Sequence, residues 1–315
     1  MFRSGFTSTS TALLSAVFVC LTWLTGCGGE ASADGKLAMV ATTGHIHDAL
    51  QQITAGAEDR VSLTLIYAPG TDPHTDAPSG KDIEALEDAK AIFYNGLHLE
   101  APLSQLLTVE YADKSFEMAS AFPESTRLES GDEDEKKRFD PHIWNHLVGW
   151  AGCVEALAER VAELDPEEAD RYRKQGKAYA DELRKADAWA AEQLAAIPAE
   201  RRFLVSTHDA FNYFAHPHEL KTLSPLGIST DKQPSVAEMS EVVDLVIDNK
   251  VPVIFVESGT SSDVIRAIQE ACSDKGWDVK VAAKELFADT LGEPPYDTFL
   301  KAFRSNVEVI SGALK

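Results

Sequence analysis

Short runs of β-branched and aliphatic residues alternate along the chain with segments in which apolar residues recur every three or four positions. This alternation is typical of strands and helices in a parallel α/β fold. The predicted strands of the first half are Leu37–Thr43, Val61–Tyr67 and Ala91–Tyr94, and those of the second half are Phe203–Ser206, Val253–Val256 and Val279–Ala282. We therefore predict two lobes, each a mainly parallel sheet flanked by helices.

One long segment between these halves has a helical pattern of its own. Asp165 is a candidate N-cap, and no proline follows Pro166 until Pro198. The pattern predicts one spine helix over Pro166–Ile197, about 48 Å long at 1.5 Å per residue, which joins the two lobes. The alternative is two shorter helices broken near Gly176, because glycine weakens a helix interior.

The N-terminus has the pattern of an export leader. Arg3 precedes the apolar run Thr11–Leu24, which is too short to span a bilayer and is typical of a signal peptide. The run ends in Leu24-Thr25-Gly26-Cys27, which resembles a lipobox, so we expect cleavage before an acylated Cys27. The predicted organisation is a lipoprotein signal peptide at 1–26, a first lobe at 27–164, the linking helix at 165–198 and a second lobe at 199–315.

Charge and cysteine content exclude one class of partner and indicate the state of the thiols. The net charge of −22 repels phosphate backbones, so nucleic acid is excluded as an expected partner. Once Cys20 is cleaved off and Cys27 is acylated, only Cys153 and Cys272 remain, and both lie on apolar helix faces. We predict buried, unpaired thiols rather than a disulfide framework.

Three histidines and one aspartate are candidate metal ligands. The tripeptide Asp-Pro-His occurs twice, ending at His74 and at His142, while His208 and Asp289 each follow a predicted strand of the second half. Open α/β sheets place ligand groups at such strand ends. Three imidazoles and one carboxylate suit a divalent ion of zinc, manganese or iron. Taken singly, however, each residue is equally typical of a polar strand end or a turn.

Seven motifs in one order resemble those of a known family. They are Ala41-Thr42-Thr43-Gly44, Gly70-Thr71-Asp72-Pro73-His74, Phe93-Tyr94-Asn95-Gly96-Leu97-His98-Leu99-Glu100, Asp140-Pro141-His142-Ile143-Trp144, Ser206-Thr207-His208-Asp209-Ala210-Phe211, Phe255-Val256-Glu257-Ser258 and Asp289-Thr290-Leu291-Gly292. Together they resemble the manganese/zinc ABC-transporter solute-binding lipoproteins of cluster A-I, whose fold is two α/β lobes joined by a long helix.

The resemblance implies that His74, His142, His208 and Asp289 bind the transported metal, Mn²⁺ or Zn²⁺, with Fe²⁺ as a third candidate. It implies an exported, monomeric protein with a lipid anchor, on the outer face of the cytoplasmic membrane or in the periplasm. Such a protein hands its ion to a membrane permease that works with a separate ATPase.

Other residues are candidates for supporting or peripheral roles. His98 and Glu100 are candidate extra ligands or a pair that opens a helix, and Glu257 is a candidate for orienting a ligand histidine or for capping the next helix. His45 and His47 would share a face of an extended segment, as a peripheral metal-binding pair, or would be simple polar residues at a helix start.

Two other functions are alternatives to metal import. A secreted zinc hydrolase would need a metal with an open position and a nearby base, but the sequence has neither a His-Glu-x-x-His nor a Gly-x-Ser-x-Gly motif. We therefore expect no enzymatic activity. A surface adhesion lipoprotein with a structural metal is the second alternative, and it predicts that removing the metal unfolds the chain.

Overall fold

The computed structural model describes residues 35–130 and 139–315, which belong to one compact unit. The predicted signal peptide at 1–26 and Cys27 lie outside the described residues. Within these two ranges, the helices are all too short or too polar to cross a membrane.

The N-terminal lobe is built on a four-stranded parallel sheet with the order β2-β1-β3-β4. Its strands and helices are β1 (Leu37–Ala41), α1 (Gly44–Ile53), β2 (Val61–Leu65), α2 (Gly80–Asp88), β3 (Ala91–Tyr94), η1 (Ala101–Leu103), η2 (Leu106–Glu110), β4 (Ser115–Glu117), η3 (Met118–Ala121) and η4 (Glu124–Thr126). Both faces of β1 are covered, since Met39, Val40 and Ala41 are all buried. A run of consecutive apolar residues is what such a central parallel strand requires.

The C-terminal lobe contains two short parallel strand pairs, β5-β6 and β7-β8. Its elements are β5 (Phe203–Val205), α5 (Asn212–Ala215), η7 (His216–His218), β6 (Lys221–Leu223), α6 (Val236–Asp248), β7 (Val253–Ile254), α7 (Asp263–Asp274) and β8 (Lys280–Val281). The backbone N–H of Phe255 donates to Val205, which joins the two pairs. These strands are shorter than predicted, although backbone hydrogen bonds continue past their ends, from Ser206 to Leu223 and from Ala282 to Ile254.

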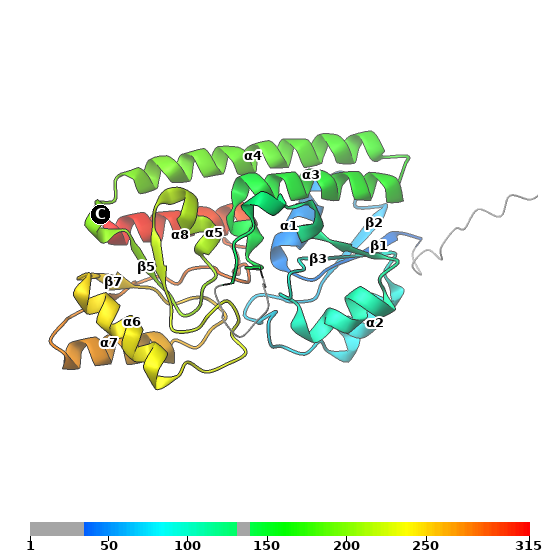
Figure 1. Ribbon diagram of the computed structural model, residues 1–315. Helices are drawn as coiled ribbons and strands as arrows, with labels where there is room; N and C mark the ends of the chain where they lie inside the picture. The colour runs from blue at the N-terminus through cyan, green and yellow to red at the C-terminus, as the bar shows by residue number, and fades with distance from the viewer. Residues whose placement is uncertain (1–34, 131–138) are drawn as a thin grey trace, which may run out of the picture. The chain divides into compact units, whose positions relative to one another are not determined.

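The remaining elements are the long helices α3 (Leu147–Leu164), α4 (Ala169–Ala195) and α8 (Phe299–Leu314) and the three-residue helices η5 (Ile143–Asn145) and η6 (Ala199–Arg201). The unbroken α4 runs along both lobes (Figure 1), which confirms the predicted spine and excludes the break near Gly176. A Cβ at Gly176 would collide with Ala158 of α3, so the glycine serves the close packing of the two helices.

The predicted N-cap of the spine helix was wrong. Asp165 closes α3 instead, and α4 begins four residues later, at Ala169, with Glu168 at its N-cap position. The carboxylate of Asp165 is held by the guanidinium of Arg60, at 2.6 and 2.8 Å, and by the hydroxyl of Tyr172. The carboxylate of Asp165 is thus part of a tertiary ion pair, and the N-cap position of α4 has no side-chain cap hydrogen bond.

The helix α6 opens with a capping box formed by Ser235 and Glu238. Cys153 in α3 and Cys272 in α7 are both buried and free, which confirms the prediction for these two thiols. In the N-terminal lobe the carboxyl ends of the parallel strands lie at the same edge of the sheet, and the loops that leave this edge and the ends of β5, β7 and β8 carry the residues described next.

Candidate metal centre

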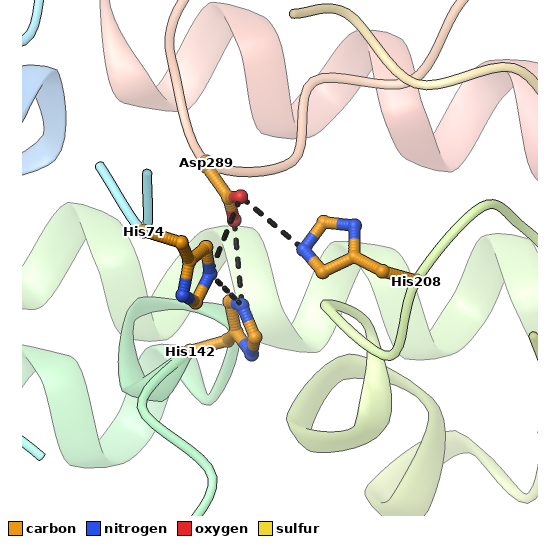
Figure 2. A group of neighbouring side chains, drawn as sticks. All are labelled: His74, His142, His208 and Asp289. Atoms are coloured by element: carbon orange, nitrogen blue, oxygen red, sulfur yellow. Dashed lines mark hydrogen bonds and ion pairs between the residues drawn. The ribbon is translucent and has the colours of Figure 1, made fainter. Parts of the chain in front are cut away.

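His74, His142, His208 and Asp289 come together in the folded chain (Figure 2). Each lies on a different segment: after β2, just before η5, after β5 and after β8. One ligand atom from each residue lies within 4.8 Å of all the others, and all four residues are buried. Positions separated by 68, 66 and 81 residues in sequence therefore form one cluster.

The distances show donors that face a common point. Nε2 of His74 lies 3.3 Å from Nε2 of His142, which lies 3.4 Å from Oδ1 of Asp289. Nε2 of His208 lies 3.2 Å from Oδ2 of the same carboxylate. Among the described residues, Nε2 of His208 and Oδ1 of Asp289 have no hydrogen-bond partner. Buried atoms of this kind are costly unless something satisfies them, and a cation at their centre would do so.

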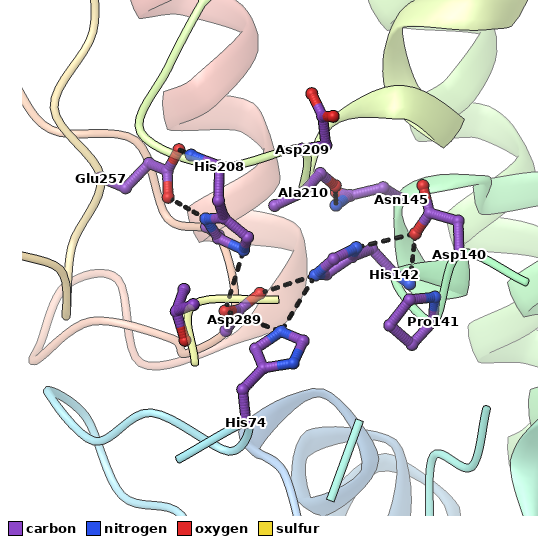
Figure 3. Close-up of polar contacts among 12 residues, drawn as sticks. His74, Asp140, Pro141, His142, Asn145, His208, Asp209, Ala210, Glu257 and Asp289 are labelled. Atoms are coloured by element: carbon purple, nitrogen blue, oxygen red, sulfur yellow. Dashed lines mark hydrogen bonds and ion pairs between the residues drawn. The ribbon is translucent and has the colours of Figure 1, made fainter. Parts of the chain in front are cut away.

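Two of the histidines are oriented by a carboxylate on their far side (Figure 3). Nδ1 of His142 lies 2.7 Å from Oδ1 of Asp140, and Nδ1 of His208 lies 2.5 Å from Oε2 of Glu257. The other oxygen of Glu257 accepts the backbone N–H groups of Thr207 and His208. A carboxylate on Nδ1 keeps the proton there and leaves Nε2 free to bind a metal.

The charges of the cluster shift the proton affinities of its members in opposite directions. Burial lowers the pKa of His74 to about 4, although Asp289 opposes this shift. Burial alone would raise the pKa of Asp289, but His208, His142 and His74 together hold it far below its usual range. Burial also opposes charge on His208, yet the carboxylates of Glu257 and Asp289 raise its pKa well above the ordinary value. These shifts favour the ionised form of Asp289, the neutral form of His74 and the charged form of His208.

Aromatic residues support the cluster from behind. Trp144 packs edge-on against the ring of His142, and its indole N–H donates to the carbonyl of Ala288, next to Asp289. The ring of His45 stacks on Trp144 with the ring centres 4.5 Å apart. This packing connects His142 with the segment that carries Asp289.

The structure does not bring His45 and His47 together as a pair. Both lie in α1, two positions apart, so they leave the helix in different directions. His45 is buried, and burial lowers its pKa to about 3, whereas His47 is partly exposed. The extended segment with a shared face is therefore wrong, and the alternative position at a helix start is confirmed, because α1 begins at Gly44.

His98 and Glu100 also lie outside the four-residue group. Glu100 is buried, and its carboxylate accepts the hydroxyl of Thr42 at 2.6 Å and the N–H groups of Asn95 and Gly96 at 2.7 and 3.1 Å. These bonds use its oxygens to hold the backbone after β3. His98, two residues before Glu100, is exposed and has a left-handed φ of 68°.

Asp140 is the supporting residue that the sequence interpretation missed. Its Oδ1 binds both Nδ1 and the backbone N–H of His142, at 2.7 and 2.9 Å, and Asn212 donates to its other oxygen. In the first Asp-Pro-His turn, Oδ1 of Asp72 accepts the N–H of His74 at 2.8 Å. The repeated tripeptide was the available signal, since a short acidic side chain two residues before a histidine can bond to its backbone.

Comparisons with known proteins find relatives that are named for metal binding or metal uptake. A sequence profile of the ZnuA family, described as zinc-uptake complex component A, periplasmic, matches residues 39–313. The chain is 34% identical over 309 residues to the manganese-binding lipoprotein MntA of Bacillus subtilis, with 96% of this chain and 99% of the relative covered. It is 28% identical over 311 residues to the metal ABC transporter substrate-binding lipoprotein SloC of Streptococcus mutans, with 96% and 98% covered.

Solved structures agree as well. The structure of the periplasmic zinc binding protein TroA from Treponema pallidum superimposes with a TM-score of 0.83 at 32% identity, covering 89% of this chain and 99% of that one. This likeness extends over both lobes and the long helix between them.

Proposed function

The chain belongs to the ZnuA family of periplasmic zinc-uptake components, and on this basis we propose that it captures Mn²⁺ or Zn²⁺ outside the cytoplasm and delivers it to a membrane permease. The permease would work with a separate ATPase, as in an ABC importer. The observation that carries the proposal is the buried group of three imidazoles and one carboxylate, gathered within 4.8 Å from both lobes.

The chemistry of the donors fits a transition metal as cargo. Neutral imidazole nitrogens and a carboxylate bind zinc, manganese and ferrous iron, whereas calcium and magnesium prefer oxygen alone. We assign His74, His142, His208 and Asp289 as the ligands, with Asp140 and Glu257 as the residues that orient two of the rings. Asp289 has both oxygens near ring nitrogens, so the site can offer four or five donor atoms.

Binding and release, rather than catalysis, is the activity that this site supports. A catalytic zinc site keeps one position for water beside a general base. Here the site has four protein ligands, and the nearby carboxylates of Asp140 and Glu257 are bonded to ligand histidines. We propose that the protein is a solute-binding protein without enzymatic activity.

Export with a lipid anchor completes the proposal. We propose that residues 1–26 are removed and that Cys27 is acylated, which would hold the monomeric protein at the outer face of the cytoplasmic membrane or in the periplasm. The lipobox-like sequence before Cys27 supports this, as do the relatives named as lipoproteins. The first lobe, the linking helix and the second lobe would then span 27–164, 165–198 and 199–315.

Substitution of His208 tests the proposed site. His208→Ala should weaken binding of Zn²⁺ and Mn²⁺ strongly in calorimetric titration. Loss of a residue that only supports a ligand lowers metal affinity about 10- to 100-fold, and loss of the ligand itself should lower it more. His216 is an exposed histidine in the same lobe, so His216→Ala is the matched control and should bind as the wild type does. Unchanged titration of His208→Ala, with a normal circular dichroism spectrum, would refute the assignment.

A further inference from the structure

A cavity of about 480 Å³ leads to the metal centre from one side. Among the four ligand residues, His74 is the one that lines it. The opposite wall is the segment 225–234 of the C-terminal lobe, between β6 and α6. His142 and His208 are 0% exposed, whereas His74 and Asp289 are 5% and 6% exposed. Of these two, His74 is the one that faces the cavity.

The loop that carries His74 is tied directly to that opposite wall. The hydroxyl of Thr230 donates to Oδ2 of Asp72 at 2.5 Å, although the two residues are 158 positions apart. The other oxygen of Asp72 accepts the backbone N–H of His74 at 2.8 Å. One carboxylate thus holds the backbone of a ligand with one oxygen and the far lobe with the other.

His74 differs from the other two ligand histidines in how its ring is supported. The rings of His142 and His208 are held by the carboxylates of Asp140 and Glu257. Among the described residues, Nδ1 of His74 has no carboxylate partner. The position of His74 is set by its backbone, and that backbone is bonded to Asp72.

We propose that the hydrogen bond between Asp72 and Thr230 is a latch that keeps His74 on the ion, and that His74 is the first ligand to leave on release. The proposal rests on the proposed function, and it makes Thr230 a positioning residue that never touches the metal. Opening the lobes at this cavity breaks the bond and frees the loop of His74, while His142 and His208 keep their carboxylates.

Thr230→Val tests the latch, because valine keeps the shape of threonine and removes the donor. The full chain is loaded with Zn²⁺ and mixed with excess chelator, and the release rate is measured by stopped flow. We expect release about three- to tenfold faster, from the loss of one hydrogen bond. Thr230→Ser keeps the hydroxyl and should restore the wild-type rate, and circular dichroism should show that both variants keep the fold.

Thr71→Val is the matched control. Thr71 lies in the same loop as Asp72, but its hydroxyl donates within its own lobe, to the carbonyl of Ala68. Wild-type release from Thr230→Val, or equal acceleration in Thr71→Val, overturns the latch and leaves the proposed function standing. If valine disturbs the fold, Thr230→Ala makes the same test. A wild-type chain that binds neither Zn²⁺ nor Mn²⁺ overturns the proposed function, and the latch with it.

Discussion

The two Asp-Pro-His turns have the same three residues and use the aspartate in different ways. In both turns Oδ1 of the aspartate accepts the backbone N–H of the histidine, at 2.8 Å for His74 and 2.9 Å for His142. Asp140 is fully buried and also binds the ring of its own histidine. Asp72 leaves its histidine ring alone and binds Thr230 in the other lobe.

On the proposed assignment of His74 and His142 as ligands, this difference separates a ligand that is held in place from one that lobe movement can release. The ring of His142 is held by Asp140, packs against Trp144 and is closed off from solvent. His74 lines the cavity and keeps its position through a bond that lobe movement can break. A transport protein needs both kinds of ligand, since it must bind its ion firmly and still release it.

Removing each histidine in turn gives the largest expected effects. His142→Ala and His74→Ala should both weaken metal binding by more than about 100-fold, because each removes a ligand rather than a supporting partner. Only His142→Ala should also destabilise the metal-free fold, by about 1–3 kcal/mol, since it leaves the buried carboxylate of Asp140 without its ring partner. Calorimetric titration measures the first effect and urea denaturation the second. Equal loss of stability in the two variants would contradict the distinction between the turns.

Changing only the aspartates should have a smaller effect. Asp140→Asn should reduce affinity about 10- to 100-fold, because the amide can donate to Nδ1 of His142 and so favour the ring tautomer with its proton on Nε2. Asp72→Asn should reduce equilibrium affinity less than about tenfold, since no ring tautomer depends on Asp72. Competition against a chelator of known affinity measures both values. A larger loss of affinity in Asp72→Asn than in Asp140→Asn would contradict the stronger supporting role assigned to Asp140.

Much of the fold could be predicted from the sequence, because strands and helices leave local patterns of apolar residues. Alternating apolar runs and helical periodicity predicted the strands β1, β2 and β3 and the long helix α4, and these are present. The end of α3 was missed, because Asp165 looks like an N-cap until Arg60, 105 residues away, is known to bind it. Ion pairs at such separation leave no periodic pattern.

The site was predictable to a different degree. The histidines stood at strand ends or in a repeated tripeptide, but no local rule connects positions 66 to 81 residues apart, and the family resemblance supplied the link. The different use of Asp72 and Asp140 could not be predicted, because the tripeptide is identical in both turns. The surroundings decide it: Asp140 is fully buried and bonded to Asn212, whereas Asp72 is bonded to Thr230 of the other lobe.

The histidines also differ in whether they must lose a proton before they bind a metal. At about pH 7.5, His74 is neutral because its pKa is lowered to about 4, and Asp289 is ionised because its pKa is lowered as well. His208 carries a proton, because Glu257 and Asp289 raise its pKa despite burial. Binding should therefore displace about one proton, from His208, and affinity should fall about tenfold per pH unit as the pH drops toward 5.

Calorimetry in buffers of different ionisation enthalpy counts that proton, since the observed heat varies with the buffer in proportion to the protons released. Glu257→Gln is the informative variant, because it removes the carboxylate nearest to Nδ1 of His208 and so lowers the pKa of that histidine. It should release measurably less than one proton. The same proton count in Glu257→Gln would mean that the proton does not come from His208, and that a carboxylate partner is not what distinguishes this ligand from His74.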